Sequence, residues 1–139
     1  MSYVEKTINY LEQIGGVDVQ NTNVNGQEII GFSYTINHKS FNLAIFHSQI
    51  EDRIVFQTFA TLPNAYREPD LEFYKIIEKL NTNSMLGHLM FLEKDGDYFI
   101  NYKSNLTIDS KNENMRTLEL FITTSLQMIS INHSELNII

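Results

Sequence analysis

The middle of the chain reads, from Ile30 to Thr61, IGFSYTINHKSFNLAIFHSQIEDRIVFQTFAT. Apolar residues in this stretch recur at every second position, with small or polar residues between them. This period of two is typical of a β-strand that buries one face. Two polar breaks, at residues 37–39 and 49–52, divide the stretch into three strands. Because parallel strands need long crossovers, these short connections predict an antiparallel meander.

Three other segments have apolar residues at helical spacing and predict amphipathic helices over residues 3–14, 70–82 and 113–130. Residues that favour helix N-termini stand at their starts, namely Ser2, Asp70 and the pair Ser110 and Glu113. The tail from residue 132 is given no assignment.

Asp95-Gly96 predicts a tight hairpin turn between strands at residues 86–94 and 97–103, and residues 106–108 are a candidate extension of the second strand. The polar, Asn-rich segment at residues 18–26 predicts a loop. The expected order is therefore α-β-β-β-α-β-β-α in a single domain over residues 1–139. This is an α+β fold, with a five-stranded antiparallel sheet and three helices packed on one face.

The chain has a formal net charge of −7 and no cysteine. An acidic protein repels the phosphate backbone, so no nucleic-acid partner is expected. The charge serves solubility or, alternatively, attracts a basic partner. The absence of cysteine fits a reducing compartment. No stretch is long enough to span a bilayer, and the start does not resemble a signal peptide. We therefore expect a cytoplasmic location and no membrane partner.

The sequence contains no recognisable catalytic, phosphate-binding or cofactor-binding motif. The histidines lack the spacing of a metal site on a helix or strand; they are His38, His47, His88 and His133. We therefore predict no catalytic residue, no metal and no cofactor, and a protein that is not an enzyme. An enzyme or small-ligand binder with a pocket between helices and sheet remains an alternative, because sites also assemble from distant residues.

Phe46, Val55 and Phe59 fall on the strand face opposite to the main apolar set, together with Asn42 and Gln57. A half-apolar face of this kind suits a protein partner better than water, and we predict a partner or dimer surface there. The alternative is that a helix or loop of the same chain covers these residues. A register shift of one residue would exchange the two faces.

One passage resembles a known family. Residues 78–91 read EKLNTNSMLGHLMF, and a hairpin with Asp95-Gly96 and residues 98–102, YFINY, follows. In Leu80-Asn81 and Gly87-His88-Leu89 this passage is similar to the YbjN-like family, also called bacterial sensory transduction regulators. The expected element order is also that of type III secretion chaperones, whose fold this family resembles. Those chaperones are small, acidic and dimeric, and they bind an extended segment of a client protein. The resemblance implies no catalytic residue.

These observations lead to two hypotheses for function. The first is a non-enzymatic protein-binding module, chaperone-like or regulatory, that acts as a homodimer with a protein partner of unknown identity. The second is an immunity or antitoxin-like protein that neutralises a basic partner, since small size and acidity fit this class equally well.

Overall fold

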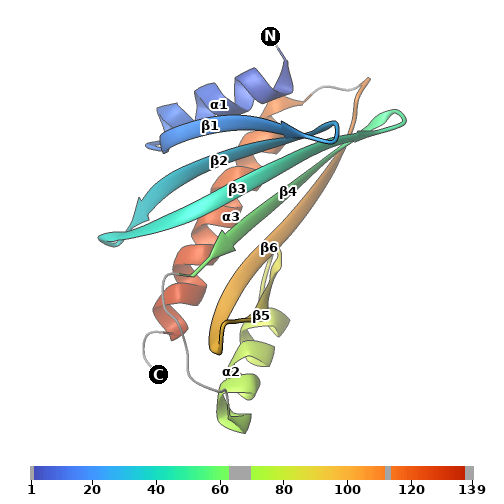
Figure 1. Cartoon of the computed structure of the whole chain (residues 1–139). Helices are drawn as coiled ribbons and strands as arrows, with labels where there is room; N and C mark the ends of the chain where they lie inside the picture. The colour runs from blue at the N-terminus through green and yellow to red at the C-terminus, as the bar shows by residue number, and fades with distance from the viewer. Residues whose placement is uncertain (1, 63–69, 112–113, 137–139) are drawn as a thin grey trace.

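The computed structural model of the chain describes residues 2–62, 70–111 and 114–136, and Figure 1 shows their arrangement. Within them the order is α-β-β-β-β-α-β-β-α. The helices are α1 (Tyr3–Gln13), α2 (Leu71–Thr82) and α3 (Met115–Leu136). The strands are β1 (Val17–Val24), β2 (Gln27–Ile36), β3 (Lys39–Ile50), β4 (Arg53–Thr61), β5 (His88–Lys94) and β6 (Asp97–Asp109).

All six strands form one antiparallel sheet in the order β1-β2-β3-β4-β6-β5. Its four hairpins have two-residue turns, and each turn contains at least one residue with positive φ. Such turns match the right-handed twist of the strands that they join. The predicted turns at Asn37-His38 and Asp95-Gly96 are among them. The predicted meander corresponds to β2, β3 and β4, so this part of the prediction is confirmed.

The sheet has six strands, so the prediction of five was wrong, and the predicted loop at residues 18–26 is largely strand β1. This strand lies at the sheet edge, and nearly all of its side chains are exposed. Backbone hydrogen bonds to β2 hold it, and these do not depend on apolar side chains. A sequence signal did exist, since Asn25 and Gly26 have φ of 52° and 81° and form the turn to β2. Asn-Gly is a strong hairpin dipeptide.

The helices pack on one face of the sheet. Tyr3 of α1 contacts Phe56 of β4 with ring centroids 5.8 Å apart, and Phe73 of α2 contacts Phe91 of β5 at 5.3 Å. Helix α3 runs diagonally behind the sheet in Figure 1, and the Ser125 hydroxyl lies 2.8 Å from that of Ser104 on β6. The core is thus a single layer between these helices and the sheet, as the sequence predicted.

Two helix starts follow the predicted caps, and the third does not. Ser2 accepts a hydrogen bond from the backbone N–H of Glu5, and Asp70 accepts one from that of Phe73. Ser110 lies five residues before α3 and donates its hydroxyl proton to the Asp52 carbonyl oxygen at 2.8 Å, while the Asn114 side chain accepts from the N–H of Thr117 at 3.2 Å. Glu113, which was predicted to share the third cap with Ser110, lies outside the described residues. Helix α3 extends to Leu136, six residues beyond the predicted end, because Asn132 and His133 are buried despite their polarity.

The residues of the family-like passage fasten α2 to the edge strand β5. The Asn81 side chain donates to the carbonyl oxygen of Leu89 at 3.1 Å and accepts from the N–H of Leu89 at 2.7 Å. One amide therefore satisfies both outward backbone groups of an edge-strand residue. Tyr102 donates its hydroxyl proton to the carbonyl oxygen of Leu86 at 2.6 Å, just before Gly87. These positions have architectural roles.

Replacing Asn81 with alanine should destabilise the fold by about 2 kcal/mol, because two backbone groups of Leu89 lose their partner. The measurement is urea unfolding followed by circular dichroism. Asn83→Ala is the matched control, since Asn83 is exposed at the end of the same helix. We expect this variant to lose less than about 0.5 kcal/mol. Equal losses in the two variants would contradict the role of the Asn81 amide.

Gly87→Ala should cost about 3 kcal/mol or more, because a Cβ atom would overlap the Lys103 carbonyl oxygen and lie 2.7 Å from the Tyr102 ring. Gly26→Ala is the control, because it shows how much of the lost stability comes from backbone strain alone, without the steric clash. Gly26 has a similar positive φ of 81°, but a Cβ atom added there would have no neighbour within 4 Å, so its loss should be about 1 kcal/mol. Thermal unfolding of both variants measures the difference, and similar losses would refute the close approach at Gly87.

Candidate functional site

The face of the sheet opposite the helices carries an apolar centre. Phe46, Val55 and Phe59, the three predicted surface residues, all lie on it and are half-buried. Ile29 of β2 pairs with Phe46 and joins them. We call this surface the open face, because no helix in the described parts of the chain packs against it. The structure thus brings the three predicted residues to one face, while the binding of a partner there stays a prediction.

The centre of the open face combines a pair of contacting, mutually tilted aromatic rings with a hollow. The ring centroids of Phe46 and Phe59 are 4.9 Å apart, and the Lys103 ammonium group lies 5.4 Å from the centroid of Phe59. Beside Phe59, the small side chain of Ala44 pairs across the strands with Gly31. Ala44 also lies opposite Phe59 on β4, and these two residues line a hollow of about 240 Å³ together with Asn42, Thr61 and Asn101. A side chain from another molecule has room to enter there.

Paired polar side chains border this centre. Ser33 donates to Asn42 at 3.0 Å, and Thr61 donates to Asn101 at 2.9 Å. At the other end of the strands, the Gln27 amide donates to the Ser48 hydroxyl at 2.8 Å. An apolar centre with a polar border is the composition of a protein–protein interface.

Sequence reasoning missed three members of this surface. Ile29 was excluded because the first strand was expected to begin at Ile30. Gly31 and Ala44 also lie on this face, and the sequence gives no signal for the hollow beside Ala44, because it forms between the paired strands β3 and β4. The register between strands carries that information, and single-strand periodicity does not.

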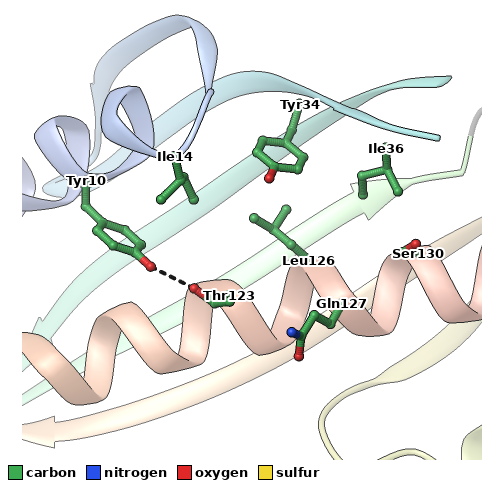
Figure 2. A pocket seen from close by; sticks show the side chains of 8 residues that line it. All are labelled: Tyr10, Ile14, Tyr34, Ile36, Thr123, Leu126, Gln127 and Ser130. Atoms are coloured by element: carbon green, nitrogen blue, oxygen red, sulfur yellow. Dashed lines mark hydrogen bonds between the residues drawn. The ribbon is translucent and has the colours of Figure 1, made fainter. Parts of the chain in front are cut away.

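A second concave site lies on the opposite side of the sheet, between α1, α3 and β2 (Figure 2). It has a volume of about 410 Å³. Its mainly apolar walls come from Tyr10, Ile14, Tyr34, Ile36 and Leu126. The Tyr10 and Thr123 hydroxyls lie 2.7 Å apart and join the two helices at one end, as Figure 2 shows. We refer to this site as the α1–α3 cavity.

Two histidines are held in apolar surroundings. Burial lowers the pKa of His47 below its ordinary value of 6.5, and its ring lies 5.1 Å from that of Phe56. Burial, with Lys39 nearby, also lowers the pKa of His133, which packs edge-on against Phe41. In the described parts of the chain, no three His, Asp or Glu residues gather into a group that could hold a metal ion. None of the described helices has the length and apolar character needed to cross a bilayer.

The architecture defines a class of α+β proteins in which helices cover one face of a single antiparallel sheet. The solved structure of YbjN from E. coli, a candidate transcription regulator, has this fold. The match covers 98% of this chain and 92% of that one, with a TM-score of 0.62 and 14% sequence identity. At that identity the likeness shows the fold alone. No protein-family model matches the chain, and a comparison with curated proteins also finds no match.

Stability should fall as the pH drops from about 7.5 to 5.5, because the unfolded chain then binds protons that the buried histidines resist. The pKa of each histidine is lower in the folded state than its ordinary value of 6.5. The free energy of unfolding is therefore unaffected by these groups at a pH above 6.5 and decreases as the pH falls below 6.5. Urea unfolding at the two pH values tests this. In the double variant His47→Asn with His133→Asn the slope should be shallower. Asn83→Ala, an exposed change that removes no titratable group, is the control and should keep the slope of the parent.

Proposed function

We propose that the chain is a non-enzymatic protein-binding module, chaperone-like or regulatory, that acts as a homodimer through its open face. The observation that carries the proposal is the Phe46–Phe59 pair, two contacting rings in the middle of a sheet face that the described helices leave uncovered. Large aromatic side chains at the centre of a surface are typical of residues that dominate binding energy.

The arrangement of the open face supports a second copy as its first partner. A two-fold dimer places the same patch on both subunits, so the patch has to complement itself. The ring of Phe59 stands next to the hollow over Ala44, and in a two-fold pairing each ring can enter the hollow of the other copy. Lys103 lies at the ring of Phe59, and side chains of the polar border hydrogen-bond to each other within the chain. Polar groups that already have a partner cost less to desolvate.

The net charge favours protein over nucleic acid as the further partner. YbjN is described as a candidate transcription regulator, but this chain has a charge of −7 and would have to approach a polyanion. If this chain has a regulatory role, its charge therefore favours binding to another protein over binding to nucleic acid. Exposed carboxylates speed the encounter with a basic surface.

The same charge favours a second candidate, an immunity or antitoxin-like protein that neutralises a basic partner. The two functions differ in where the partner binds. Neutralisation of a basic protein would depend on the carboxylates and weaken strongly with salt, whereas contact through the apolar open face would not. Salt dependence of partner binding therefore distinguishes them.

The dimer is tested by light scattering coupled to size exclusion. The parent chain should show twice its mass of 16.2 kDa, and Phe46→Glu should dissociate, with a dissociation constant raised roughly hundredfold by a buried, unpaired carboxylate. Leu71→Glu, on an exposed side chain of α2, is the control and should leave the dimer intact.

Circular dichroism of each variant checks that the fold persists. We expect it to persist, because Phe46 is half-buried and lies outside the helix-covered core. A parent chain that stays monomeric over a wide concentration range would refute the homodimer. A dimer that tolerates Phe46→Glu would place the interface elsewhere.

A further inference from the structure

The α1–α3 cavity exists because α1 is too short to cover the length of β2. The helix ends at Gln13, and Gly15 and Gly16 turn the chain away toward β1. A Cβ atom at Gly16 would lie 2.8 Å from the carbonyl oxygen of Leu11, so only glycine permits this tight exit. Tyr34 and Ile36, further along β2, therefore lie beyond the end of α1 and face the cavity from the sheet (Figure 2).

The size of the cavity fits a small molecule. Its volume of about 410 Å³ lies within the range of roughly 300–1,000 Å³ found for small-molecule sites. The Tyr10–Thr123 hydroxyl pair fixes the distance between α1 and α3 at one end of the cavity. The N–H of Asn114, the residue just before α3, donates to the Tyr3 hydroxyl of α1. Two contacts between the helices thus hold the walls apart without filling the space.

Besides the paired Tyr10 and Thr123 hydroxyls, the cavity has few polar side chains. Gln127 and Ser130 come from α3, and Tyr34 comes from the sheet opposite. None of these three side chains forms a hydrogen bond with another described residue, so all three are available to a ligand. The described residues that line the cavity include no Lys, Arg, His, Asp or Glu. A charged ligand would lose its hydration there without gaining a counter-charge.

We propose that the α1–α3 cavity binds an uncharged, mainly apolar small molecule that carries one or two hydrogen-bonding groups. Its apolar body would lie between Ile14, Tyr34 and Leu126, whose side chains converge in Figure 2. Its polar group would face Ser130 and Gln127. This site lies on the helix-covered side of the sheet, so the proposal does not depend on protein binding at the open face.

A pair of related fluorescent probes tests both the site and its preference for neutral ligands. N-phenyl-1-naphthylamine is uncharged and has one N–H group, and 1-anilinonaphthalene-8-sulfonate has the same skeleton with a sulfonate. The chain has no tryptophan, which keeps the emission background low. Titration of the full chain should give saturable binding of the neutral probe at one site per chain. The sulfonate should bind at least about tenfold more weakly, because it finds no cation there.

Three variants locate the bound probe. Ser130→Phe places a ring at the half-buried wall of the cavity and should weaken binding of the neutral probe at least about tenfold. Thr124→Phe is matched to it, since Thr124 is equally half-buried on α3 but lines a different hollow beside Leu106. Phe46→Glu alters the open face. Both of these controls should bind the probe as the parent chain does.

Protein NMR on the parent chain tests the site without any substitution, so the result does not depend on whether a variant folds. The methyl signals of Ile14, Ile36 and Leu126 should shift on addition of the neutral probe, and those of Val55 should not. Absence of saturable binding to the parent chain would overturn the proposal. So would loss of binding in Thr124→Phe or Phe46→Glu, or equal affinity for the sulfonate. Dissociation of a dimer by Ser130→Phe would also overturn it, because the cavity would then hold a side chain of a second copy.

Discussion

Ile45 pairs with Thr58 across β3 and β4, and Phe46 pairs with Gln57 one position further along. This register determines which side of the sheet each side chain occupies, because successive residues of a strand point to opposite faces. Ile45, Phe56 and the neighbouring core residues thereby meet the helices, while Phe46 and Phe59 face away from them. A shift of one residue would expose Phe56 and bury Gln57, so the core and the candidate interface both depend on it.

The two faces then offer different kinds of site. On the open face, the polar side chains around the aromatic pair are already bonded to each other, as in Ser33–Asn42 and Thr61–Asn101. Such a surface offers shape and apolar area, which suit another protein. In the α1–α3 cavity, Tyr34, Gln127 and Ser130 are not bonded to described residues and surround a concave apolar space. That combination suits a small molecule, which binds in a concave, mainly apolar site with a few directed hydrogen bonds.

Much of the fold was predictable because it depends on short-range periodicity. A few consecutive residues are enough to predict each of three elements: the alternation from Phe32 to Ile36, the helical spacing in α1 and the Asp95-Gly96 turn. Strand β1 was not predicted, because an edge strand with exposed side chains has no apolar period to detect. The predicted surface residues also share one face, because strand parity is a local property. The hollow over Ala44 and the cavity beyond Gly16 were not predictable, since each depends on distances between separate elements.

The likeness to YbjN at 14% identity is consistent with this division between local pattern and specific side chains. An apolar period of two in the strands and of 3.6 in the helices is enough to bury one face of the sheet, and many residue combinations supply it. Positions such as Asn81 and Gly87 add tighter requirements, because one amide pairs with the Leu89 backbone and one missing Cβ admits the Tyr102 ring. A shared fold does not determine which side chains form a binding site. The function of this chain therefore has to be argued from the residues of the open face and the α1–α3 cavity themselves, such as Phe46, Phe59 and Tyr34.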